Sequence, residues 1–169
     1  MPLYPSLFRL PFTVRWLLLA CAVAVLFKTS MRMGIPGNQG SVLFSIDFMF
    51  NLGHQFLYGY FTLALLLVLS PLTPLRRKTW IWLPCLVFAM GIVDEWNQSF
   101  RFRDSGLSDV ISDLVGCFHV LLLAVWFSKP RKPHLTALLL SSQVLIGVGW
   151  NLVVVYAPDP PLPFFDSRG

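Results

Sequence analysis

The chain has 169 residues, of which 56% are hydrophobic and only 12% are charged, and its mean hydropathy is +0.67. Soluble domains carry about 25% charged residues, so this composition excludes an ordinary soluble domain and indicates that much of the surface faces lipid. The formal net charge of +5 does not indicate nucleic-acid binding, because the basic residues fall in short connectors rather than along one face.

Five apolar segments follow one another and predict an all-α integral membrane protein, a bundle of about five transmembrane helices. A spanning helix needs about 20 apolar residues; the second and fifth segments reach that length, and the first and fourth reach it with flanking residues. The third is interrupted by Pro84 and spans the membrane only if its last turn carries Asp94 and Glu95. The segments are Phe12–Phe27, Phe48–Leu69, Trp80–Val93, Val110–Phe127 and Leu135–Tyr156.

The domain organisation and topology follow from the connectors. Residues 1–156 form a single transmembrane domain, and the proline-rich residues 157–169 form a tail that cannot be helical. Cytoplasmic loops carry an excess of Lys and Arg. The basic connectors at 76–78 and 129–132 lie on the same side as the N-terminus if the five segments alternate, so we predict a cytoplasmic N-terminus. The acidic loop 94–109 and the tail then face the extracytoplasmic side.

Polar residues recur at helical spacing in the second segment, at the end of the third and at the start of the fourth. Residues three or four apart share one face of a helix, and ionisable groups at the membrane edge are costly unless they pair or line a functional cavity. We therefore expect the three stripes to converge on one extracytoplasmic pocket. The stripes are Asp47, Asn51, His54 and Tyr58; Asp94, Glu95 and Gln98; and Asp109 and Asp113.

Such a pocket has three candidate chemistries. A carboxylate in a site of low dielectric can act as a general acid or base, several carboxylates with a histidine could hold a hard divalent cation, and arginines could grip a phosphate or carboxylate. No other cofactor is expected. The candidate catalytic residues are Glu95, Asp109 and His54, and the candidate ligand-binding residues are Asp94, Gln98, Arg101, Arg103, Asp113, Asn51 and Tyr58.

A purely structural role is the alternative for each of these residues. In this interpretation Arg103 holds the loop on the bundle by pairing with Asp109 or Glu95, and Ser108 or Asp109 caps the fourth helix. His54 and Tyr58 could bridge helices. Farther along the chain His119, Gln143 and Asn151 are expected to make hydrogen bonds between helices.

Glu95 and Asp94 compete for the role of central acid. Adjacent residues point about 100° apart on a helix, so only one of the two can face the pocket squarely. Asp94 lies four residues and Glu95 three residues before Gln98.

These residues resemble the motifs of the VanZ-like family of small bacterial membrane proteins. The resemblance spans roughly 51–116 and is carried by His54 and Tyr58, by Asp94-Glu95-x-x-Gln98, by Arg103 and by Asp109-Val110-x-x-Asp113-x-x-Gly116. The family pattern places its Glu three residues before the Gln, on the same face, so the resemblance favours Glu95 over Asp94 as the central acid. The chain departs from the family in three places: Asn51 stands where a Lys is common, Arg101-Phe102 where Pro-Gly is common, and Asp113 where the family has Asn.

The resemblance implies a multi-pass protein of the bacterial cytoplasmic (inner) membrane, in a family whose name-giving member is tied to teicoplanin resistance. The expected function is to bind or modify a lipid-linked or anionic component of the cell envelope, which would lower susceptibility to glycopeptide antibiotics. The expected partners are the bilayer and that component, and no nucleic acid. The alternatives are a non-catalytic scaffold for another envelope protein and a small transporter or ion-binding protein. The sequence indicates neither the oligomeric state nor a defined reaction.

Overall fold

The computed structural model describes residues 10–30, 46–69, 78–100, 106–128 and 133–156. These residues form five long helices, which confirms the predicted all-α fold. Each helix is long and apolar enough to cross a membrane, as expected of a multi-pass membrane protein. The helices are α2 (Phe12–Ser30), α3 (Ile46–Leu69), α4 (Thr79–Ser99), α5 (Leu107–Ser128) and α6 (Pro133–Tyr156).

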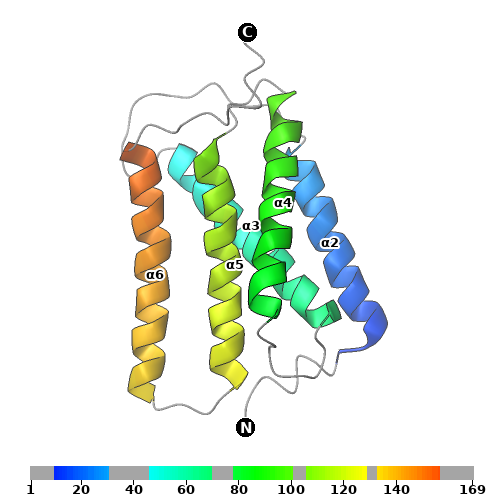
Figure 1. Ribbon diagram of the computed structural model, residues 1–169, viewed down its shortest axis with the longest axis vertical. Helices are drawn as coiled ribbons and strands as arrows, with labels where there is room; N and C mark the ends of the chain where they lie inside the picture. The colour runs from blue at the N-terminus through cyan, green and yellow to red at the C-terminus, as the bar shows by residue number, and fades with distance from the viewer. Residues whose placement is uncertain (1–9, 31–45, 70–77, 101–105, 129–132, 157–169) are drawn as a thin grey trace.

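Helix α3 is the central element of the bundle. In Figure 1 the helices α6, α5, α4 and α2 stand side by side, and α3 runs diagonally behind α5 and α4. It packs most extensively against α5, and it also contacts α2, α6 and α4. The beginning of α3, the end of α4 and the beginning of α5 lie at the same end of the bundle, in the upper part of Figure 1.

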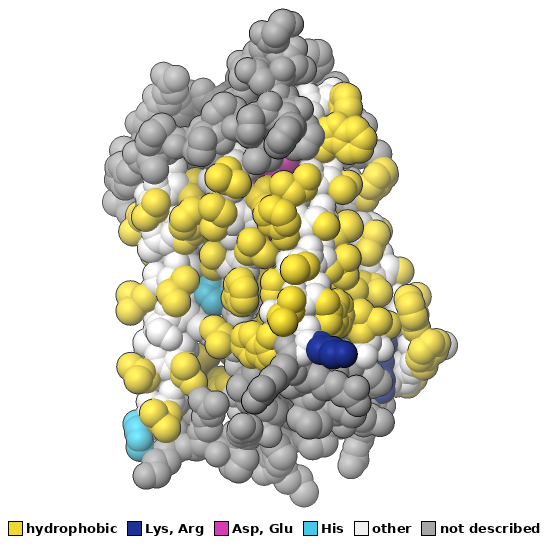
Figure 2. All heavy atoms as spheres, viewed as in Figure 1, with side chains coloured by type: hydrophobic (Ala, Val, Ile, Leu, Met, Phe, Trp, Pro, Cys, Tyr) yellow, Lys and Arg dark blue, Asp and Glu magenta, His cyan; other side chains and the backbone are white. Residues whose placement is uncertain are grey.

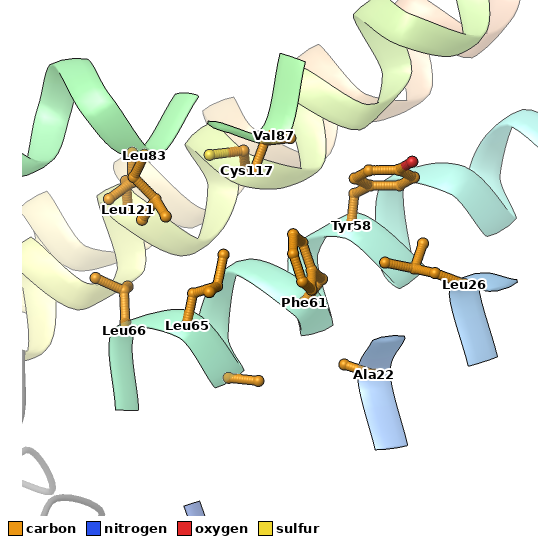
Figure 3. Packing of buried hydrophobic residues seen from close by; sticks show 11 residues of the cluster. Ala22, Leu26, Tyr58, Phe61, Leu65, Leu66, Leu83, Val87, Cys117 and Leu121 are labelled. Atoms are coloured by element: carbon orange, nitrogen blue, oxygen red, sulfur yellow. The ribbon is translucent and has the colours of Figure 1, made fainter. Parts of the chain in front are cut away.

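An apolar core fills the crossing of α3 with its neighbours (Figure 3). Its side chains come from α2, α3, α4 and α5. They are at most 6% exposed and pack against one another at this crossing. The residues labelled in Figure 3 are Tyr58, Phe61, Leu65 and Leu66 of α3, Leu83 and Val87 of α4, Cys117 and Leu121 of α5, and Ala22 and Leu26 of α2.

The outer surface of the described helices is strongly apolar. Phe56, Ile81 and Leu145 are 72%, 69% and 71% exposed. Figure 2 shows hydrophobic side chains over most of the described surface in that view. Contiguous apolar patches of this kind mark contact with a membrane or another protein.

Pro84 does not end the third segment. A proline lacks the N–H that would bond to the carbonyl of the residue four positions earlier, and here that position is Trp80, in the first turn of α4. The helix continues to Ser99 and is therefore longer than the predicted Trp80–Val93. As a result, Asp94 and Glu95 lie inside its last two turns.

Candidate functional site

The structure brings the predicted polar residues of three helices together at one end of the bundle. We call this set the polar cluster. Hydrogen bonds join α3 to α5, α4 to the start of α5, and α3 to α4 within it. Its members are Asn51, His54 and Tyr58 of α3, Asp94, Glu95 and Gln98 of α4, and Asp109 and Asp113 of α5.

A buried pair of His54 and Asp113 links α3 to α5. The Nδ1 atom of His54 lies 3.0 Å from Oδ1 of Asp113, and the two side chains are 12% and 0% exposed. The ring of Tyr58 lies nearly parallel to the imidazole, with centroids 6.3 Å apart. The carboxylate thus fixes the orientation of the imidazole, as in catalytic and metal-binding histidines.

Gly91 of α4 makes room for the Asp113 carboxylate. A Cβ atom at position 91 would lie 2.7 Å from Oδ2 of Asp113, which is closer than two such atoms approach in proteins. This oxygen has no hydrogen-bond partner among the residues that the structure describes. The carboxylate therefore packs against the backbone of α4. One of its oxygens is hydrogen-bonded to His54, and the other has no partner among the described residues.

Glu95 is completely buried and ties α4 to the beginning of α5. Its Oε2 atom accepts a hydrogen bond of 3.1 Å from the main-chain N–H of Gly106, the residue before α5 begins at Leu107. The first N–H groups of a helix have no partner within the helix, and negative charge is favourable beside them. Within the described part of the chain, the Oε1 atom of Glu95 has no hydrogen-bond partner.

Asp94 occupies the rim of the polar cluster rather than its centre. Its Oδ2 atom accepts a hydrogen bond of 3.0 Å from Nε2 of Gln98, and its carboxylate is hydrogen-bonded to the Tyr58 hydroxyl. Asp94 is partly exposed, whereas Glu95 is at 0%. Both acids therefore belong to the polar cluster, and Glu95 is the more deeply buried of the two.

Asp109 lies near the other charged members of the polar cluster. It is close enough to interact electrostatically with His54, Glu95 and Asp113. Helix α5 begins at Leu107, so Ser108 and Asp109, the predicted candidates for its cap, both lie inside its first turn. An N-cap residue stands before the first helical residue, so the capping interpretation does not match the observed boundary.

Three predicted members of the site cannot be placed. Arg101 and Arg103 lie outside the described residues, and so does the side chain of Asp47. The ion pair of Arg103 with Asp109 or Glu95 stays a prediction.

A second group of polar contacts, which attaches α6 to the bundle, was only partly predicted. Nε1 of Trp150 donates to Oγ of Ser112 over 2.9 Å, and the His119 ring is hydrogen-bonded to the main chain of Gln143. The contact of His119 agrees with its predicted role between helices. Asn151 differs from its prediction, because its amide donates to the carbonyl of Gly147 within α6.

Gln55 is the residue of this second group that sequence reasoning missed. Its amide lies 3.4 Å from the carbonyl of Gly147 on α6 and is buried among three helices. Its sequence signal was the four-residue step from Asn51 along the polar stripe of α3.

The polar cluster contains side chains of the types that exchange protons in enzymes. Glu95 and the imidazole of His54 are groups that serve as general acids and bases. Among the residues that the structure describes, no group of three or more His, Cys, Asp or Glu side chains is placed to hold a metal ion. Comparisons of this chain with protein-family models, curated proteins and solved structures found no match.

Proposed function

We propose that this chain is a VanZ-like membrane protein of the bacterial cell envelope. In this proposal the polar cluster binds or modifies a lipid-linked or anionic envelope component, and the protein thereby lowers susceptibility to glycopeptides such as teicoplanin. The observation that supports it best is the complete burial of Glu95 and Asp113. In each carboxyl group one oxygen accepts a hydrogen bond, and the other has no partner among the described residues. The resemblance described above supplies the envelope context.

The residues of the cluster suggest a division of labour. Glu95 and the His54–Asp113 pair supply the groups that could exchange a proton with the bound component. Arg101 and Arg103 follow α4 in the sequence and are suited to bind its phosphate or carboxylate, because a guanidinium can donate two parallel hydrogen bonds to such a group. The apolar core around Phe61, Leu83 and Leu121 lies beyond the polar cluster and favours this function over a continuous transport path.

The proposal includes a cytoplasmic N-terminus, which places the polar cluster on the extracytoplasmic side. In a variant with the native cysteines replaced, new cysteines at Ser99 and Gly37 should react with a membrane-impermeant thiol reagent added to intact cells. A cysteine at Thr79, at the opposite end of α4, should not react. Labelling at Thr79 with protection at Ser99 would invert the topology and place the cluster in the cytoplasm.

The functional test compares the adjacent acids. Glu95→Gln keeps an oxygen that can accept the hydrogen bond from Gly106 but removes the charge and the proton-transfer group, so we expect it to abolish glycopeptide tolerance in a susceptible host. Asp94→Asn should retain most of the phenotype, because the rim position can still accept from Gln98. Both variants are assayed at matched abundance in the membrane.

The same pair of variants separates the proposal from its main alternative. If Asp94→Asn is inactive and Glu95→Gln behaves as the unaltered protein, Glu95 is not the central acid. If both variants keep the phenotype, the polar cluster is structural and the protein acts as a scaffold. In that case changes at helix-packing positions should abolish the phenotype instead.

A further inference from the structure

Helix α6 meets the rest of the bundle with a polar face. It stands at the edge of the bundle, and α5 stands between it and α4 (Figure 1). None of the described side chains of α6 belongs to the apolar core. The described residues of α6 that are buried recur at steps of four, on one face of the helix: Gln143, Gly147 and Asn151. Hydrogen bonds, rather than packed apolar side chains, therefore determine how α6 sits on α3 and α5.

Two of these hydrogen bonds lie directly beside the pair of His54 and Asp113. The Nε1 atom of Trp150 donates to Oγ of Ser112 over 2.9 Å, and Ser112 precedes Asp113 on α5. The amide of Gln55, which follows His54 on α3, lies 3.4 Å from a main-chain carbonyl of α6. Helix α6 thus contacts the sequence neighbour of each member of the pair.

Trp150 makes the stronger of the two contacts. Its 2.9 Å bond has the usual length of an N–H···O hydrogen bond, whereas 3.4 Å is long for one. Ser112 is completely buried, and within a membrane no water is at hand to replace a lost hydrogen bond. Trp150 is therefore the residue of α6 best placed to act on α5.

The rotation of α5 about its own axis decides whether the carboxylate of Asp113 reaches His54. Adjacent residues point about 100° apart on a helix, so a bond that restrains Ser112 also restrains the direction of Asp113. An aspartate oxygen lies roughly 5 Å from the helix axis, so a rotation of about 20° moves it by about 2 Å. A displacement of that size would break the 3.0 Å contact with Nδ1 of His54.

We propose that Trp150 is a positioning residue for the pair of His54 and Asp113. Through its hydrogen bond to Ser112 it holds α5 at the rotation in which the Asp113 carboxylate meets the imidazole. Helix α4 contacts the same carboxylate at Gly91, so α5 is restrained by the helix on each side of it. This inference rests on the proposed function, in which the pair exchanges a proton with the bound component.

The test follows the His54 side chain by nitrogen NMR of the full-length protein in detergent, with isotope-labelled histidine. The chain has three histidines, and His54→Ala identifies the signal of His54. The Nδ1 resonance shifts when its hydrogen bond is lost, so it reports the contact with Asp113 and not overall stability. In Trp150→Phe, which keeps an aromatic ring but has no N–H, the resonance should shift at least half of the way to its position in Asp113→Ala.

Two further variants show whether Trp150 acts through Ser112. Ser112→Ala removes the other end of the same hydrogen bond with a much smaller change, and it should shift the His54 resonance in the same direction. The double variant should shift it no further than the larger of the two single effects. Trp16→Phe is the matched control, because it makes the same substitution at a 46% exposed position of α2; it should leave the resonance unchanged.

Three results would overturn the proposal. The first is an unchanged His54 resonance in both Trp150→Phe and Ser112→Ala. The second is a shift in Trp150→Phe that Ser112→Ala does not share, because Trp150 would then act by its bulk. The third is an equal shift in Trp16→Phe. If Trp150→Phe does not fold, Ser112→Ala decides alone: a shifted resonance supports the proposal and an unchanged one overturns it.

Glycopeptide tolerance, assayed in the same variants, separates this inference from the proposed function. A shifted resonance together with reduced tolerance supports both. A shifted resonance with full tolerance refutes the role of the pair in the function and leaves the positioning by Trp150 supported. Lost tolerance in Trp150→Phe with an unshifted resonance refutes the positioning alone.

Discussion

Replacing Gly116 by alanine should destabilise the bundle by about 3 kcal/mol, at the upper end of the usual range for overpacking. A Cβ atom at this position would overlap the carbonyl oxygen of Gln55 and would lie 2.9 Å from its carbonyl carbon and 3.0 Å from its Cα. These obstructing atoms belong to the backbone of α3, so they cannot move aside as a side chain could. Helices α3 and α5 would have to separate where they pack most extensively.

The measurement is reversible unfolding of the purified protein in detergent, with Gly53→Ala as the matched control. Gly53 lies on α3, the helix that Gly116 of α5 contacts, and a Cβ at position 53 would meet no atom within 4 Å. Because alanine has the higher helix propensity, Gly53→Ala should be neutral or stabilising by up to about 1 kcal/mol. Equal stability of the two variants would show that α3 and α5 do not approach as closely at Gly116 as described.

Removing the carboxylate of Asp113 should cost about 3 kcal/mol, the lower end of the range for breaking a buried ion pair. The Asp113→Ala variant leaves the imidazole of His54 without its partner at 3.0 Å. The lower end applies because His54 is 12% exposed and can recover some hydration. Asp113→Asn keeps an oxygen that can accept from His54 and should therefore cost less than Asp113→Ala.

A double-mutant cycle shows whether this loss comes from the pair itself. The cycle uses His54→Ala, Asp113→Ala and the double variant, with unfolding free energies measured in one detergent. Groups in direct contact couple by about 0.5–3 kcal/mol, so the double variant should be more stable than the sum of the two single losses indicates. Additive losses would mean that His54 and Asp113 do not interact, and the orienting role of Asp113 would be withdrawn.

The membrane-spanning elements were predictable because their signal is local. Long apolar runs specify helices whether or not their neighbours are known, and the periodicity of Asn51, His54 and Tyr58 places them on one face. The boundaries were less predictable. The third helix extends past Val93 to Ser99 because the polar side chains of its last turns find partners within the bundle, including Gly106 for Glu95 and Tyr58 for Asp94.

Contacts between distant segments were not predictable in detail. The sequence showed that Glu95 shares a face with Gln98, but not that its carboxylate meets the N–H of Gly106. The bond between Trp150 and Ser112 was also missed, because a tryptophan near the end of a segment is typical of the membrane interface. Such contacts depend on the rotation of each helix about its axis, which apolar periodicity in a lipid-facing helix fixes poorly.

The sequence by itself determined that this chain forms apolar helices of membrane-spanning length and that its acids gather near the ends of two of them. Composition and helical period suffice for that. Only the tertiary structure decided that α3 crosses between α5, α4 and α2, and that Glu95 lies deeper than Asp94. The physical reason is close packing: Gly116 lets the backbones of α3 and α5 touch, and Gly91 admits the carboxylate of Asp113 against α4. Those approaches set where the polar stripes meet.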